Sequence, residues 1–177
     1  MRNIVYYVAT SLDGFISGVD GNIEGFIPEG DGVDRYLSDL KEYDTVIMGR
    51  NTYEFGYRFG LKPGQAPYPH MQHYIFSKDL KFDDKMDNVH VRCLDIREIQ
   101  KLRKEEGTDI YLCGGGQFAG WLLEHEQIQY VKVKLNPVIL GQGIRLFEGS
   151  AKFARTELLE TNTYDNGIQI INYKILY

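Results

Sequence analysis

The stretch Asp109–Phe118, DIYLCGGGQF, organises the chain, because an apolar run ends there in three consecutive glycines before a helical pattern resumes. This order predicts a strand, a tight turn and a helix. Residues without a Cβ let the turn adopt dihedral angles closed to other residues and let a ligand touch the main chain. The amides and positive dipole end of the following helix suit a phosphate. The stretch therefore predicts either a dinucleotide pyrophosphate site or a tight corner that holds no ligand.

The composition of the chain restricts its class. Its 177 residues, 43% of them hydrophobic, fit one domain spanning residues 1–177 with a substantial core. The net charge of -5 argues against a general binder of nucleic acid or of a membrane surface. No apolar run reaches the roughly 18 residues of a membrane span. Cys93 and Cys113 form no disulfide framework, so we expect a reducing cytoplasm. His70 and His73 have no third ligand at metal spacing, so we expect no metal site.

Strand patterns alternate with helix patterns through the first two thirds of the chain. Buried strands are predicted at 3–10, 44–48, 74–76, 89–93 and 109–113, and helices at 33–43, 96–106 and 117–124, with a short helix after residue 49. Residues 17–32 hold five glycines and one proline and predict a long loop. Repeated strand-then-helix units indicate a largely parallel sheet with helices on both faces.

The last third of the chain predicts antiparallel structure. Lys132 and Lys134 alternate with apolar residues over Tyr130–Leu135, which predicts a strand with one face in water. Residues 138–147 then read as a glycine-bearing loop. Asp165-Asn166-Gly167 separates two strand-like runs and predicts a C-terminal hairpin. The fold class expected from all these segments is α/β, with one mixed sheet that ends in an antiparallel hairpin.

Three predicted strand ends carry anion-binding groups. They are Gly49-Arg50-Asn51-Thr52, Ser77-Lys78 and the glycine turn with Gln117 and Phe118. The carboxyl ends of parallel strands lie at one edge of a sheet, so these groups are expected to line one elongated cleft suited to a dinucleotide. No acidic residue stands about 20 residues after the glycines, where a Rossmann site for NAD would place one. Cations at the other strand ends instead favour a 2′-phosphate, and so NADP.

Each of these residues has an alternative reading. Arg50 could form a surface ion pair and Thr52 could cap a helix. Asp13, where the first strand ends, and Asp34, on the first helix, are the candidate catalytic acids that orient substrate or relay a proton. Asp13 also suits a turn in which it caps its own backbone. Cys113 is either a catalytic thiol or, more commonly for a buried cysteine, a packing residue.

In order, these motifs resemble the dihydrofolate reductase-like superfamily. The motifs are Ala9-Thr10-Ser11-Leu12-Asp13-Gly14, Val46-Ile47-Met48-Gly49-Arg50-Asn51-Thr52-Tyr53-Glu54, Ser77 and Gly114-Gly115-Gly116. The Ser-Leu-Asp-Gly segment and Pro137-Val138-Ile139-Leu140-Gly141-x-Gly143-x-x-Leu146-Phe147 resemble most closely the reductase domain of bifunctional riboflavin-biosynthesis deaminase/reductases. The resemblance covers nearly the whole chain.

The resemblance implies a three-layer α-β-α fold with about eight strands, NADPH as cofactor, a cytoplasmic location and a homodimer. It places Gly49, Arg50 and Thr52 at the cofactor phosphates and Ser77 at the adenosine ribose end. Ala9 and Lys78 are further expected cofactor-binding residues. Gly114, Gly115, Gly116, Gln117 and Phe118 would follow the pyrophosphate. A cis peptide between the first two glycines of the triplet is also implied.

The chain departs from both substrate patterns of that superfamily. The acid that holds the pterin in dihydrofolate reductases falls on Val33, and the acid that precedes the glycine turn in riboflavin reductases is replaced by Cys113. The resemblance as a whole still implies an NADPH-dependent reductase of a small heterocycle, most like 5-amino-6-(5-phosphoribosylamino)uracil reductase. The alternatives are dihydrofolate reductase activity and an NADP-binding protein without catalysis.

Overall fold

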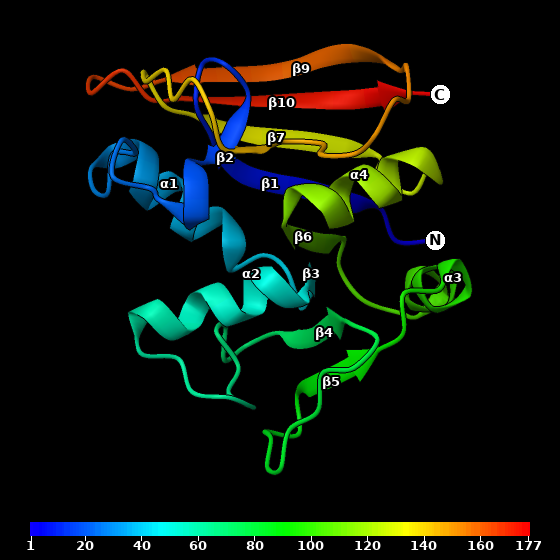
Figure 1. The fold of residues 1–177 in the computed structure, drawn as a ribbon. Coiled ribbons are helices and arrows are strands. Elements are labelled where there is room, and N and C mark those ends of the chain that lie inside the picture. The colour runs from blue at the N-terminus through cyan, green and yellow to red at the C-terminus, as the bar shows by residue number, and fades with distance from the viewer.

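The computed structural model describes residues 1–177 and contains one mixed sheet of eight strands. Its order is β5-β4-β3-β6-β1-β7-β10-β9 (Figure 1). The strands are β1 Ile4–Thr10, β3 Thr45–Gly49, β4 Gln72–Phe76, β5 Val89–Arg92, β6 Ile110–Gly114, β7 Tyr130–Leu135, β9 Arg155–Thr163 and β10 Gln169–Leu176. All are parallel except β10, which runs antiparallel to both β7 and β9. The predicted fold class and the C-terminal hairpin are confirmed.

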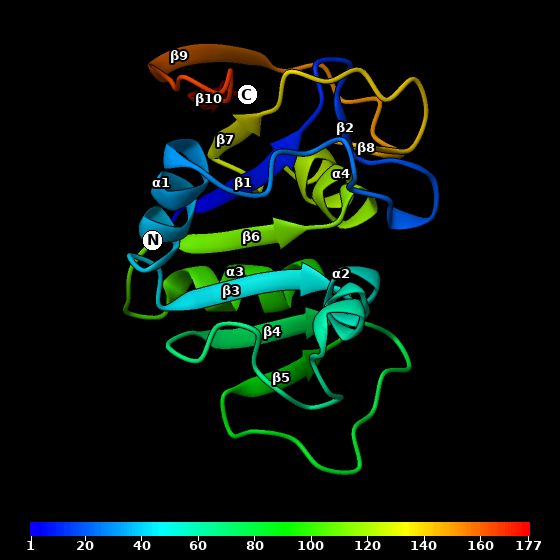
Figure 2. The same cartoon turned by 90° about the vertical axis from the view of Figure 1, so that its left-hand side faces the viewer.

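Helices cover both faces of this sheet. They are α1 Asp31–Leu40, α2 Arg50–Phe55, α3 Ile96–Lys104 and α4 Gly116–Glu124, with 3-10 turns η1 Val19–Gly21 and η2 Gly56–Phe59. In Figure 2, α1 lies in front of the sheet and α3 and α4 lie behind it. No helix combines the length and the apolar character that crossing a bilayer would require.

Each face of the sheet contributes to a separate hydrophobic core. Tyr6 of β1 belongs to the cluster that contains Phe118 and Leu122 of α4, whereas Tyr7 belongs to the cluster with Val33 of α1 and with α2. Successive side chains of a strand point to opposite faces, so a central strand covered on both sides needs apolar or aromatic residues throughout. The sequence of β1 meets this requirement, as predicted.

The prediction that β7 has one face in water is wrong. Lys132 and Lys134 lie on the face covered by α1, where Lys132 forms an ion pair with Asp39 of that helix and Lys134 is buried. The strand is central, between β1 and β10, so neither of its faces is open. The alternation that indicates an amphipathic strand instead reflects two lysines held against a helix.

Two short strands were not predicted. Phe15–Ser17 (β2) and Ile144–Arg145 (β8) pair antiparallel in a separate two-stranded sheet. Two or three residues carry too little periodicity to indicate a strand, and the pairing joins segments more than a hundred residues apart. This small sheet brings the loop before β8 over the carboxyl ends of the main strands (Figure 2).

Candidate active site

The three strand ends that carry anion-binding groups lie next to one another. The sheet order β4-β3-β6 places Ser77, which follows β4, beside Gly49 at the end of β3. Gly114, at the end of β6, lies on the other side of β3. The arrowheads of these parallel strands point to the same edge in Figure 2. The groups that the sequence separates by up to 65 residues therefore form one row along the sheet edge.

The glycine turn lies against Thr52 and has no room for side chains. Gly114 has a φ of +132°, and the peptide bond between Gly114 and Gly115 is cis, as the resemblance implies. A Cβ on Gly115 would lie 3.0 Å from Thr52 Oγ1, and a Cβ on Gly116 would lie 2.1 Å from the carbonyl oxygen of Arg145. The turn therefore presents main-chain atoms beside a hydroxyl, which is the kind of surface that a phosphate group approaches.

The helix α4 begins directly at this turn, with Gly115 as its N-cap residue. The first amides of a helix have no partner within the helix, so those of Gly116, Gln117 and Phe118 are available to an anion. The ring of Phe118 is buried and stacks on Phe76 at 5.0 Å between ring centroids. Only the main chain of Phe118 is thus offered to a ligand, whereas the side chain of Gln117 is exposed.

The cations at this edge are on the surface. Arg50 donates to Glu54 at 2.8 Å and to Asp79 at 3.1 Å, and its side chain is 41% exposed. The hydroxyl of Ser77 accepts from the amide of Leu80 at 3.1 Å. Lys78 is exposed and takes part in no ion pair. The ion-pair reading of Arg50 is therefore confirmed, and the exposed guanidinium keeps donor groups free for a phosphate.

The sheet divides at the same edge, next to the glycine turn. The pairing of β1 with β6 begins at Ile4 and Ile110 and stops at Tyr6 and Leu112, although β1 continues to Thr10 in register with β7. Ala9 and Cys113 therefore lie on the two sides of the point where β1 and β6 separate. Main-chain groups that a neighbouring strand would otherwise use are left near Ala9, which suits a flat polar ring.

An aromatic cluster lies on the α1 side of this division. The hydroxyls of Tyr36 and Tyr111 are 2.8 Å apart, and the hydroxyl of Tyr68 is 3.8 Å from Cys113 Sγ. Burial raises the pKa values of Tyr36 and Tyr111, so both stay protonated. Burial also raises the pKa of Cys113, although hydrogen bonds from Tyr111 and Tyr68 partly oppose it. Cys113 is therefore a neutral thiol at neutral pH, unlike an activated nucleophile.

The two candidate acids lie in different surroundings. Asp13 accepts from the amides of Leu140 at 3.1 Å and Gly141 at 2.7 Å. A hydrogen bond from the Ser11 side chain, followed by these amides, lowers the pKa of Asp13 to about 2. Asp13 is therefore a carboxylate at neutral pH that fastens the loop before β8. Asp34 is exposed in the first turn of α1 and forms no side-chain hydrogen bond or ion pair.

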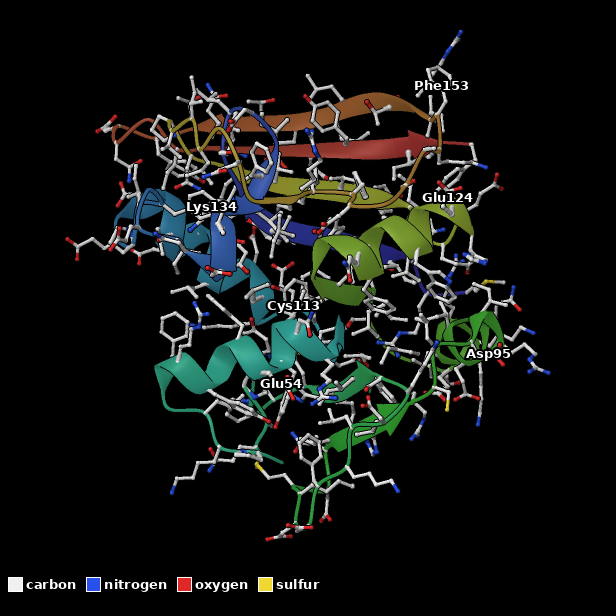
Figure 3. All side chains as sticks on the ribbon, in the orientation of Figure 1. Glu54, Asp95, Cys113, Glu124, Lys134 and Phe153 are labelled. Atoms are coloured by element: carbon white, nitrogen blue, oxygen red, sulfur yellow. The ribbon has the colours of Figure 1, made fainter.

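Lys134 and the tyrosines are polar groups near the sheet division that the sequence did not single out. Lys134 pairs in register with Ala9, and its Nζ lies 5.2 Å from the ring centroid of Tyr36 (Figure 3). The alternation over Tyr130–Leu135 predicted a strand face in water for Lys134 and gave no signal for the tyrosines.

The residues match a family model over most of the chain. Residues 2–170 match the model described as the RibD C-terminal domain. An uncharacterized protein of Bacillus subtilis (strain 168), YwjB, is 29% identical over 173 residues, which cover 96% of this chain and 96% of YwjB.

Solved structures show the same fold at low sequence identity. A putative riboflavin biosynthesis protein from Shewanella sp. PV-4 superposes with a TM-score of 0.81 at 21% identity, over the whole of both chains. A diaminohydroxyphosphoribosylaminopyrimidine deaminase/5-amino-6-(5-phosphoribosylamino)uracil reductase from Thermotoga maritima gives 0.71 at 15% identity, over 99% of this chain and 57% of that one. Dihydrofolate reductase from Enterococcus faecalis, complexed with NADP(H), gives 0.65 at 16% identity, over 98% and 94% of the chains.

Proposed function

Since the chain belongs to the RibD C-terminal domain family, we propose that it is an NADPH-dependent reductase that transfers a hydride to a small heterocycle. The first acceptor to test is 5-amino-6-(5-phosphoribosylamino)uracil, on which the Thermotoga maritima relative of the same fold is named as acting.

The row of strand ends is the observation that carries this proposal. Its order along the edge is Ser77, then Gly49 to Thr52, then the glycine turn, then Ala9. An extended dinucleotide fits this order, with its 2′-phosphate near Arg50 and Lys78 and its pyrophosphate at the amides of α4. The nicotinamide would then reach the division between β1 and β6. The Enterococcus faecalis protein of similar fold, complexed with NADP(H), supports the same choice of cofactor.

The chemistry of such a reductase is supplied by the cofactor, which donates the hydride when bound. The chain holds the ring, excludes water and orients the acceptor. Asp13, ionised and bound to the loop before β8, would hold that loop over the strand ends and orient polar groups of the acceptor. Asp34 is the second proposed acid, and its exposure suits proton exchange with water.

A second candidate is a protein that binds NADP without turnover. The observation that favours it is the position before the glycine turn, where Cys113 is a neutral thiol among tyrosines and offers no carboxylate. Folate reduction is the weaker enzymatic candidate, because Val33, at the position of the pterin-binding acid, is buried in the core and its exposed neighbour Asp34 faces water.

One titration separates these candidates. NADPH and NADH are added to the protein while nucleotide fluorescence is followed, and then the pyrimidine or dihydrofolate is added while NADPH absorbance is followed. We expect tight binding of NADPH, weaker binding of NADH and oxidation on addition of the pyrimidine. Binding without oxidation by either acceptor supports the non-catalytic candidate. Failure to bind either nucleotide overturns the assignment of all three strand ends.

Arg50→Ala tests the cofactor choice at one residue. Losing a charge-assisted hydrogen bond to the 2′-phosphate should weaken NADPH binding about tenfold and leave NADH binding unchanged. The matched control is Arg97→Ala, which removes another surface ion pair. Arg97 pairs with Asp95 at the start of α3, away from the row of strand ends. Equal weakening of both nucleotides by Arg50→Ala would contradict a role at the 2′-phosphate.

A further inference from the structure

Lys134 is a mostly buried lysine whose ammonium has no partner within the protein. Its residue is only 7% exposed, yet it forms no ion pair and its Nζ donates no hydrogen bond. It lies near the carboxyl end of β7, opposite Ala9 of β1, and therefore at the division of the sheet described above. The side chain is mostly buried, although Nζ itself keeps some contact with solvent. Charged groups removed from water are unfavourable unless paired, so a mostly buried lysine with no protein partner needs an explanation.

The neighbouring lysine on the same strand face shows that packing alone does not explain Lys134. Lys132 Nζ lies 2.5 Å from Asp39 Oδ2, which also accepts from the hydroxyl of Tyr7 at 3.1 Å. The other oxygen of Asp39 accepts from Arg35 at 2.7 Å. The interface between β7 and α1 thus builds a complete network around one lysine and leaves the other with none. Both oxygens of Asp39 accept from these other donors, and neither accepts from Lys134.

The groups linked to Lys134 are neutral hydroxyls. Its Nζ lies over the ring of Tyr36, whose hydroxyl meets that of Tyr111 at 2.8 Å. The ring of Tyr111 packs on Tyr68, and the hydroxyl of Tyr68 approaches Cys113. Figure 3 labels Lys134 beside α1 and Cys113 nearer to α2, at the two ends of this set. The ring face of Tyr36 attracts the ammonium and fixes its position but does not neutralise it.

From this arrangement we infer that Lys134 binds an oxygen of the acceptor, and that the acceptor is a planar heterocycle with a carbonyl, oxyanion or carboxylate oxygen on the α1 side. The inference rests on the proposed function and names the chemistry of its acceptor. An ammonium has only donors and complements an oxygen, whereas a carboxylate complements ring N–H groups. Binding would give the lysine the partner that the free protein lacks.

The experiment measures binding of two planar probes by calorimetry, with and without saturating NADPH. Orotate is an anionic pyrimidine, and 1-methylnicotinamide is a cationic ring of similar size. The wild-type protein should bind orotate in preference to 1-methylnicotinamide. Lys134→Met should weaken orotate binding tenfold or more, as expected for loss of a charge-assisted hydrogen bond, and Lys134→Arg should retain most of it.

Thermal unfolding of the same variants distinguishes binding from a structural role. Lys134→Met removes a charge that has no protein partner and keeps most of the length of the side chain, so its melting temperature should equal or exceed that of the wild type. The matched control, Lys132→Met, breaks the pair with Asp39 and should lower the melting temperature while orotate binding persists. A lowered melting temperature for Lys134→Met together with unchanged orotate binding would identify a structural lysine.

The outcomes also separate this inference from the proposed function. Absence of orotate binding, or equal affinity for both probes, overturns the inference even if NADPH binds and a heterocycle is reduced. Conversely, if NADPH does not bind but orotate binding depends on Lys134, the proposed reductase fails while the oxygen-binding site stands.

Discussion

Asp39 is the residue on which the interface between α1 and the sheet depends. Burial alone would raise its pKa, but hydrogen bonds from Lys132 and Arg35 outweigh burial and lower it. The carboxylate is therefore bound in its charged form and stabilises the fold. Asp39 lies on α1, where it pairs with Arg35, and it accepts from Lys132 of β7 and from the hydroxyl of Tyr7 on β1. It therefore joins α1, β7 and β1.

We predict that Asp39→Ala lowers the free energy of unfolding by about 3 kcal/mol, because Lys132 is then left buried without a partner. Urea denaturation at neutral pH measures this difference. The folded-state pKa of Asp39 is depressed, so its contribution is present above the unfolded pKa of about 3.9 and is lost as the pH falls through the lower folded value. The variant and the wild type should therefore converge in acid. Asp34→Ala, at an exposed position of the same helix, should change stability by less than about 0.5 kcal/mol.

Cys113 and Cys93 should differ in reactivity. Since burial raises the pKa of Cys113 whereas Cys93 is exposed, iodoacetamide near pH 8 should alkylate Cys93 first and leave Cys113 largely unmodified. Peptide mass spectrometry of the folded protein measures the two rates. Comparable rates, or faster modification of Cys113, would contradict the assignment of Cys113 as a neutral thiol. That result would support a catalytic role for Cys113.

At the scale of elements, the start of α4 depends on close contact with the segment around β8. A Cβ on Gly116 would lie 2.1 Å from the carbonyl oxygen of Arg145, which is main chain and cannot turn away. Gly116→Ala should therefore destabilise the protein by about 2 kcal/mol through overpacking and weaken NADPH binding by displacing the turn.

Gly18→Ala provides the control for that variant. Gly18 has an ordinary φ of -69°, and a Cβ there would lie 3.4 Å from its nearest neighbour. Melting temperatures and NADPH titrations of both variants form the test. A Gly116→Ala protein with wild-type stability and affinity would show that β8 can move aside, and that the turn does not depend on it.

Elements differ in how well their sequences specify them. The C-terminal hairpin was predicted because Gly167, with a φ of +85°, and Asn166 are typical turn residues between two strand-like runs. The environment of β7 was not predicted. The alternation of lysines with apolar residues does not show which other segments cover the strand. Lys132 becomes acceptable in the interior only through Asp39, which lies 93 residues away.

At the scale of the whole molecule, β9 is the open edge of the sheet opposite β5. Leu158 and Leu159, where the pairing of β9 with β10 is irregular, are 57% and 47% exposed. An edge strand of nine residues with apolar side chains is a template for pairing with another chain. We propose that a second copy of this chain covers it, which would give the homodimer expected from the resemblance.

Light scattering after size-exclusion chromatography tests that proposal. The wild type should be a dimer, and the double variant Leu158→Lys with Leu159→Lys should be a monomer with unchanged secondary structure. Leu37→Lys, at an exposed leucine of α1, should leave the dimer intact. A monomeric wild type, or a dimer that survives the double variant, would contradict pairing through β9.

Local sequence patterns predicted the order of the strands and helices of the main sheet, the glycine turn before α4, and the groups at each strand end. Turn dihedrals, helix starts and apolar periodicity are properties of a few consecutive residues. The tertiary structure alone decided which strand ends are neighbours, that β1 separates from β6 beside Ala9, and that Lys134 is mostly buried without a partner in the protein. These depend on pairing and covering by segments far away in the chain, and the cost of burying a charge is set by what surrounds it in space.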